Sequence, residues 1–194
     1  MTDDLLIQKL IDTLRDHTTK DNLRVSLDIA FFLISKCSNV QKYSDILYQV
    51  AQLDDTELLE KFVNLGCDMF VKDAFNTRPL DIAIRCGNCK VVEWFLNRGD
   101  FSNEPCSGLS RLLLICKRRY VSDVLDNGAL ALKMAQLFVK YGADLLNVNY
   151  SCQQTPLEAA YHFYGKNHPL THYLKDATEK QKQYGSVNGL MSHL

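Results

Sequence analysis

The chain has 194 residues, with 22 Lys and Arg against 23 Asp and Glu, so its formal net charge at pH 7 is −1. This balance excludes the strong overall field that draws a protein to nucleic acid or to an anionic membrane. Its apolar runs are far shorter than the ~20 residues of a membrane span, and its acidic start lacks the basic n-region of a secretory signal. We therefore expect a cytoplasmic protein whose seven cysteines are reduced.

Two helices are predicted in the first 43 residues. Segment 3–15 carries apolar residues at helical spacing behind two acidic residues, which favour a helix N-terminus. Segment 23–37 is apolar over much of its circumference, so it must be covered on two sides. We interpret residues 1–43 as an N-terminal helical cap or a degenerate repeat.

Residues 44–180 are predicted to form consecutive helix pairs. A loop insertion is placed near 120–128, and residues 181–194 are predicted to be a flexible polar tail. Asp54 or Asp55 is available to cap the second helix of the first pair. The predicted pairs are 44–52 with 56–65, 79–86 with 91–98, 110–116 with 129–141, and 156–164 with 169–180.

Two phrases recur at the ends of these helices. Gly66 and Gly99 lie thirty-three residues apart and close the similar phrases LLEKFVNLG and VVEWFLNRG, and AQLFVKYGAD carries the same ending at Gly142. Glycine ends a helix readily because it tolerates positive φ. The first helices open with TPLEAA from Thr155 and RPLDIA from Arg78. Proline suits the first turn of a helix, where its missing N–H has no intrahelical partner.

These phrases and their period resemble the ankyrin repeat, whose units open with T-P-L-H-x-A. The resemblance covers about residues 44–177, with Asp81 or Glu158 in the place of the histidine. It implies an all-α, ankyrin-repeat solenoid of about four stacked helix–turn–helix pairs, with short hairpin or loop fingers. The fingers would be 66–78 and 145–154, and the second is one residue longer than usual, so its register is open by one.

The resemblance also implies a function. Ankyrin-like proteins mostly bind other proteins through finger tips and first helices, which together form a concave face. We expect a non-catalytic interaction module with a protein partner. Ankyrin-like proteins are frequent in bacteria and viruses that live in host cells, so a secreted effector in the host cytoplasm is one form of this hypothesis. The partner-binding positions carried over are Lys72, Ala74, Phe75, Thr77, Arg85, Cys86, Asn149, Ser151, Cys152, Gln154 and His162.

Two aromatic residues stand out in the first finger. Exposed aromatic side chains are enriched among binding hot spots. We expect Phe75, together with Arg85, to contact the partner, and Phe70 to tuck under the finger.

The alternative is an enzyme, or an enzyme subunit, on a helical-repeat scaffold with a Cys/His-lined cleft under the insertion. The sequence contains no GKS/T phosphate loop, no G-x-G-x-x-G and no nucleophile motif. We predict no catalytic residues, no cofactor and no metal. A deep pocket lined by cysteine and histidine would favour the enzyme, and a shallow open groove the interaction module.

Three local clusters have simple structural interpretations. Cys86 and Cys89 form a single C-x-x-C, which lacks the second half of a zinc site and fits a helix end and turn. Pro169 starts a helix between His168 and His172, so His168 is predicted to cap or precede that helix. The basic patch 117–119 complements a helix C-terminus, and the alternative is a site for an acidic partner.

Overall fold

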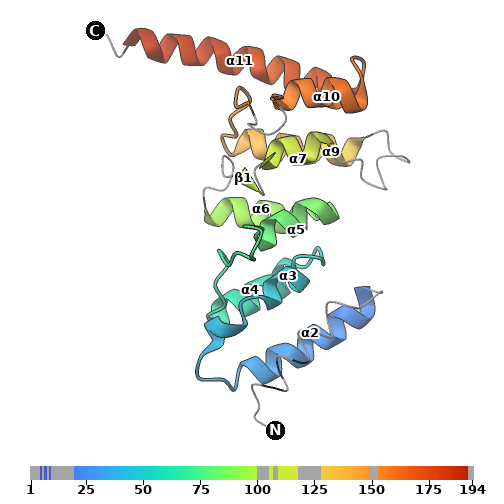
Figure 1. Cartoon of the computed structure of the whole chain (residues 1–194), viewed down its shortest axis with the longest axis vertical. Coiled ribbons are helices and arrows are strands. Elements are labelled where there is room, and N and C mark those ends of the chain that lie inside the picture. Colours follow the sequence, from blue (N-terminus) through green and yellow to red (C-terminus); the bar gives the residue numbers. More distant parts are fainter. Residues whose placement is uncertain are drawn as a thin grey trace. The chain divides into compact units, whose positions relative to one another are not determined.

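The computed structural model describes residues 5, 7, 9, 20–99, 105–106, 109–117, 128–148 and 153–191 (Figure 1). The chain divides into two compact units, Met1–Trp94 and Phe95–Leu194. Each unit is described here by itself.

Nearly all regular structure in the described ranges is helical. The exception is a short antiparallel ladder in which β1 (Pro105–Cys106) pairs with β2 (Leu109–Ser110). The all-α class predicted from the sequence is confirmed. No helix in these ranges combines the length and apolar character needed to cross a membrane.

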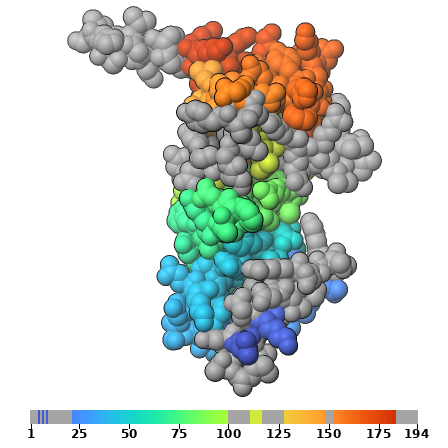
Figure 2. Space-filling model, viewed as in Figure 1, coloured from blue at the N-terminus to red at the C-terminus, as the bar shows by residue number. Residues whose placement is uncertain are grey.

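The first unit consists of helices packed around α3. This helix contacts α2, α4 and α5, and the part of the chain that contains α3, α4 and α5 forms a continuous surface from cyan to green in Figure 2. Phe31 of α2 meets Phe62 of α4 edge to face, with ring centroids 5.4 Å apart. The helices are α2 (Lys20–Ile34), the 3-10 helix η1 (Val40–Tyr43), α3 (Ile46–Val50), α4 (Thr56–Leu65), α5 (Pro79–Cys86) and α6 (Cys89–Arg98), which extends into the second unit.

Local chemistry sets the ends of α4 and α5, which begin and end where the sequence predicts. Asp55 caps α4 by accepting the Leu58 N–H at 2.9 Å. Gly66 ends α4 with φ 115°, and Gly87 ends α5 with φ 78°, both in the left-handed region that favours glycine. Four apolar side chains of the phrase that includes α5 and α6 are at most 1% exposed, namely Leu80, Ala83, Val92 and Phe95.

The N-terminal part of the chain exposes an apolar stripe. Of the predicted helix 3–15, only Leu5, Ile7 and Lys9 are described, and all three are helical. Helix α2 leaves large apolar side chains exposed at helical spacing, namely Val25, Ile29 and Phe32. Helix α2 is therefore not covered at these three positions.

The second unit contains two helix pairs, α7 with α9 and α10 with α11. The first helices, α7 and α10, contact each other, and so do the second helices, α9 and α11. Each helix also contacts its partner within the pair, which gives two layers. The bounds are α7 (Arg111–Lys117), α9 (Ala129–Lys140), α10 (Pro156–Tyr164) and α11 (Pro169–Met191).

The C-terminal segment differs from its prediction as a flexible tail, because α11 continues to Met191. At the start of this segment, Gln181 Oε1 accepts the Leu145 N–H at 2.9 Å, and its Nε2 donates to the Ala143 carbonyl at 3.3 Å. A polar side chain can therefore be fixed by backbone groups of a neighbouring loop, which composition alone does not reveal.

Candidate functional site

The loop 66–78, called the first finger below, is ordered by aspartate side chains and contains no strand. Asp73 Oδ1 accepts the N–H groups of Phe75 and Thr77 at 2.9 and 2.8 Å, and the Asp73 N–H donates to the Thr77 carbonyl at 3.1 Å. Asn76 has φ 60° between them, a conformation that asparagine tolerates better than most residues. Nearer the start, Asp68 Oδ1 accepts the Phe70 N–H at 2.9 Å.

Helix α3 and the residue before it anchor the first finger. The Tyr48 hydroxyl lies 3.0 Å from the Thr77 carbonyl oxygen and 3.2 Å from that of Val71. Ser44 Oγ, just before α3, accepts the Asp68 N–H at 2.8 Å. The finger is therefore held at both ends by side chains.

Burial is the main cause that raises the pKa of Tyr48, and the negative charges of Asp73, Asp45 and Asp81 raise it further. Its hydroxyl thus remains a hydrogen-bond donor well into the alkaline range.

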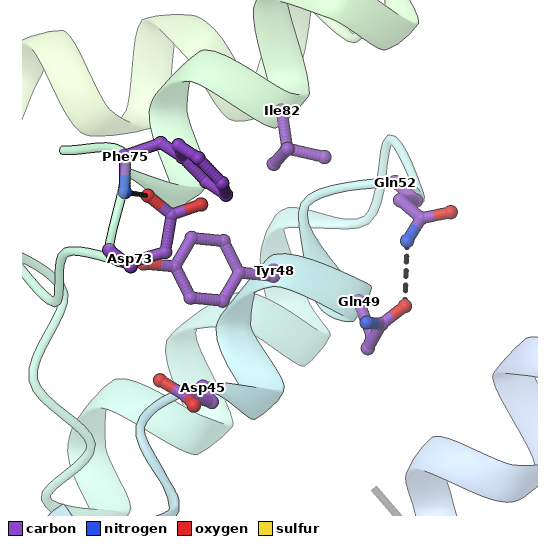
Figure 3. Close-up of a pocket in the computed structure, with 8 residues that line it drawn as sticks. Asp45, Tyr48, Gln49, Gln52, Asp73, Phe75 and Ile82 are labelled. Carbon is purple, nitrogen blue, oxygen red and sulfur yellow. Dashed lines mark hydrogen bonds between the residues drawn. The ribbon is translucent and has the colours of Figure 1, made fainter. Parts of the chain in front are cut away.

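A pocket of about 360 Å³ lies between the finger, α3 and α5, and we call it the finger pocket. Figure 3 shows Phe75, Asp73 and Tyr48 on one side and Gln49 and Gln52 on the other. The Gln52 Nε2 donates to the Gln49 Oε1 at 2.6 Å. The lining residues are Asp45, Tyr48, Gln49, Gln52, Asp73, Ala74, Phe75 and Ile82.

Both aromatic residues of the finger are exposed, so the prediction that Phe70 tucks under the finger is wrong. Phe75 is 77% exposed, whereas Phe70 is 44% exposed. The Arg78 guanidinium lies 5.9 Å from the Phe70 ring centroid, close enough for a cation–π contact. Phe70 is thus partly covered, while most of Phe75 is open to a binding partner.

The predicted partner-binding residues of the first unit differ in position and in exposure. Ala74 and Phe75 line the finger pocket, and Lys72 is exposed on the same finger. Thr77 is only 4% exposed, so the prediction that its side chain faces a partner is corrected, because its backbone groups are used to close the finger. At the end of α5, Arg85 is half-buried and Cys86 is exposed.

The predicted residues of the second finger belong to the second unit. Gln154 is half-buried. His162 is exposed, and its ring meets that of Phe163 edge to face, with the ring centroids 4.8 Å apart. The remaining predicted positions lie outside the described residues, namely Asn149, Ser151 and Cys152.

Sequence reasoning missed most of the pocket wall. Asp45, Gln49 and Gln52 are spaced four and three residues apart in the segment 44–52, so they can share one helical face. This polar stripe could have indicated a pocket wall, because the sequence predicts segment 44–52 to be the first helix of a pair. Tyr48 and Ile82 gave no comparable signal.

The same local structure occurs at both finger starts and at both finger ends. Gly66 and Gly142 have positive φ, and the N–H of the residue after each glycine donates to a phenylalanine carbonyl five positions earlier. Asn76 and Gln153 then have φ 60° and 52°, each two residues before the N-cap of a helix with proline in its first turn. The N-cap N–H is accepted by Asp81 at 2.7 Å in α5 and by Glu158 at 2.7 Å in α10.

Two buried cysteines, Cys67 and Cys116, are poor nucleophiles. Burial raises the pKa of Cys67 to about 12 and raises that of Cys116 well above its usual value. A catalytic thiolate needs a lowered pKa. Cys86 ends α5 and Cys89 begins α6, so the C-x-x-C spans a helix end and turn as predicted.

The three histidines near the end of the chain lie apart in the structure. His162 is in α10, His168 directly precedes α11, and His172 is in α11. His168 Nδ1 accepts the Leu170 N–H at 3.2 Å just before α11, which confirms the predicted capping position. A second pocket of about 360 Å³ contains His168 and no cysteine, and the finger pocket contains neither residue type. Among the described residues, no group of three His, Cys, Asp or Glu side chains is placed to hold a metal ion.

The basic patch is described only at its first residue. Lys117 is the last residue of α7, and Arg118 and Arg119 lie outside the described ranges.

No protein-family model matches this sequence, and comparison with curated proteins gives no match.

Proposed function

We propose that this chain is a non-catalytic, ankyrin-like interaction module that binds a partner protein at the finger pocket. The observation that carries the proposal is the 77% exposure of Phe75 at the wall of that pocket. Its backbone is already fixed by Asp73, so binding there loses little loop entropy. A large, ordered aromatic side chain beside a cavity is a typical binding anchor.

Helix packing within each unit supports the ankyrin-like part of the proposal. First helices contact each other in both units, α3 with α5 and α7 with α10. This is the neighbour-to-neighbour contact that repeat proteins use to bury a continuous core. The duplicated glycine turn and N-cap arrangement of the two fingers adds an independent, local form of repetition.

The chemistry of the pocket supports binding rather than catalysis. Its polar groups are carboxylates, amides and a tyrosine hydroxyl that is held by backbone carbonyls. This set lacks the paired nucleophile and base of covalent catalysis.

Affinity capture tests the proposal with the full chain as bait, in lysate of the source cells. We expect the double variant Phe75→Ala, Arg85→Ala to lose specific partners without a change in melting temperature, because Phe75 is exposed and Arg85 is only half-buried at the end of α5. The matched control is Phe32→Ala, which removes another exposed phenylalanine in the same unit. Partners that persist with the double variant, or that are lost equally with Phe32→Ala, would remove the finger pocket from consideration.

A further inference from the structure

We propose that the finger pocket binds an arginine side chain of the partner protein, an inference that rests on the proposed function. The pocket combines acidic groups, an exposed aromatic ring and amide groups within one cavity. A guanidinium group pairs with carboxylates, stacks on aromatic rings and donates several hydrogen bonds. The groups of this pocket are suited to these interactions.

The charge of the pocket selects a cation. Asp45 and Asp73 are exposed and line it, and none of the eight lining residues drawn in Figure 3 is Lys, Arg or His. The same two carboxylates, with buried Asp81, act on the Tyr48 hydroxyl and add to the rise in its pKa that burial causes. Two carboxylates and no cationic side chain therefore line the pocket.

The geometry favours a planar, multidentate donor. Asp73 uses a single oxygen, Oδ1, for both finger N–H groups, so its Oδ2 is the oxygen that an incoming donor can engage. Gln52 uses its nitrogen to bond Gln49, and its oxygen points away from Asp73 and Phe75 (Figure 3), so the carboxylates are the acceptors on which the inference depends. A guanidinium can donate to such acceptors in several directions, whereas a lysine ammonium is a point charge on a flexible stem.

The apolar lining fits the rest of an arginine side chain. Phe75 offers a ring face for cation–π stacking, and Ile82 of α5 is half-buried at the opposite end of the view from Asp45 (Figure 3). A volume of about 360 Å³ lies at the low end of the roughly 300–1,000 Å³ of ligand pockets. The pocket therefore suits one long side chain and not a folded domain surface or a large cofactor.

The test is a selection of random peptides displayed on phage, with the full chain as bait. We expect the enriched peptides to share an arginine at one position. Replacing that arginine by glutamine in a synthetic peptide should weaken binding by at least about tenfold, since it removes charge-assisted hydrogen bonds. Binding is measured by fluorescence anisotropy with a labelled peptide.

Charge-neutral variants assign the effect to the pocket. Asp73→Asn keeps an oxygen that can accept both finger N–H groups, and Asp45→Asn keeps a favoured N-cap residue whose side chain makes no cap bond in α3. Each should weaken binding of the arginine peptide by about tenfold without lowering the melting temperature. The matched control is Asp68→Asn, which removes a charge from an equivalent turn of the same finger outside the pocket lining, and it should bind as the wild type does.

The outcomes separate the two proposals. Enriched peptides that require Phe75 but contain lysine or no basic residue overturn the arginine inference and leave the proposed function standing. Arginine peptides that bind Asp45→Asn and Asp73→Asn as tightly as the wild type also overturn the inference. Peptides that bind Phe75→Ala unchanged, or the absence of any enriched peptide, overturn both.

Discussion

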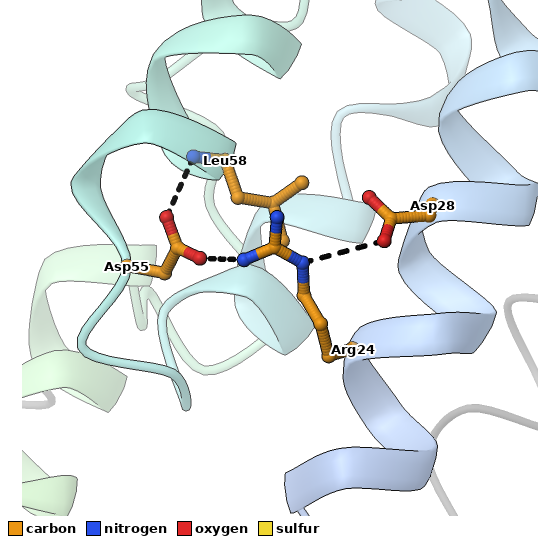
Figure 4. A network of polar contacts seen from close by, with 4 residues as sticks. All are labelled: Arg24, Asp28, Asp55 and Leu58. Carbon is orange, nitrogen blue, oxygen red and sulfur yellow. Dashed lines mark hydrogen bonds and ion pairs between the residues drawn. The ribbon is translucent and has the colours of Figure 1, made fainter.

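Asp54 and Asp55 are adjacent in the sequence, yet their carboxylates stabilise different helices. Asp54 Oδ1 accepts the N–H groups of Lys90 and Val91 in the first turn of α6, at 3.0 and 3.3 Å. Asp55 caps its own helix α4 and forms an ion pair with Arg24 of α2 (Figure 4). This dipeptide therefore links α2, α4 and the start of α6 within the first unit.

Replacing Asp55 tests the local half of this arrangement. Asp55→Ala removes the α4 cap and the ion pair, and should lower the free energy of unfolding by about 1–2 kcal/mol. Asp55→Asn keeps the capping oxygen and should recover most of that loss. Urea denaturation followed by circular dichroism measures both variants.

The control is Asp28→Ala, which removes only an exposed contact of 3.4 Å with Arg24. Exposed pairs four residues apart on a helix contribute about 0.3–0.5 kcal/mol. An Asp55→Ala variant no less stable than Asp28→Ala would show that the cap is unimportant.

Tyr48→Phe should loosen the first finger. The substitution leaves the carbonyls of Val71 and Thr77 without the hydroxyl that they share, and we expect a loss of about 1–2 kcal/mol in unfolding free energy. Amide hydrogen exchange should become faster at Phe75 and Thr77, because both N–H groups belong to the same finger. Unchanged exchange at these two amides would contradict the anchoring role.

The pKa of Tyr48 provides a second measurement on the wild type. Burial and the nearby carboxylates raise it, so Tyr48 should ionise at higher pH than exposed tyrosines do. Burial also raises the pKa of Tyr173, so ultraviolet absorbance of the phenolate during an alkaline titration should show a late component that Tyr48→Phe reduces and does not abolish.

Asn76 tests the conformation at the finger tip. Its φ of 60° lies in the left-handed region, where a residue with a Cβ is strained by roughly 1–2 kcal/mol. We expect Asn76→Gly to be as stable as the wild type or more so, and Asn76→Val to be clearly less stable, since β-branched residues rarely adopt positive φ. Ala74→Val in the same finger is the control and should have little effect. Equal stability of the two valine variants would contradict the assigned conformation.

Glu158 makes the stability of the second unit depend on pH. The backbone N–H of Thr155, and then its hydroxyl, lower the pKa of the Glu158 carboxyl below its ordinary value. A lowered folded-state pKa stabilises the fold above the unfolded-state pKa, and this contribution is lost as pH falls through the folded-state value. The stability difference between wild type and Glu158→Gln should therefore shrink from neutral to acidic pH.

Carbon-13 NMR of the carboxyl group measures the same effect directly. In Thr155→Ala the hydroxyl contact is lost while the backbone N–H remains, so the pKa of Glu158 should rise only part of the way to its ordinary value. A Glu158 carboxyl that titrates as an exposed reference glutamate does would contradict the capping box.

The helices could be predicted from the sequence where their ends are encoded locally. Pro79 and Gly87 bound α5, and Asp55 and Gly66 bound α4, because capping and left-handed termination depend on residues within one turn of the helix end. The same reasoning located His168 before α11. These features need no knowledge of distant contacts.

The features that escaped prediction depend on contacts between distant residues. Asp54 accepts the N–H of Lys90, 36 residues later in the first turn of α6, and Gln181 bonds a loop 36 residues earlier. The α3 side of the finger pocket likewise exists only because Tyr48 brings the finger against that helix. A one-dimensional pattern carries little information about which polar side chains meet across such separations.

The duplicated finger ends have a consequence for how this chain can change. Gln153 lies nine positions after Asp144, whereas Asn76 lies eight positions after Asp68, although the turn before and the cap after are the same in both. The helices therefore tolerate an added residue in between. Mutation can lengthen or rewrite the tip while the scaffold that carries it keeps its shape.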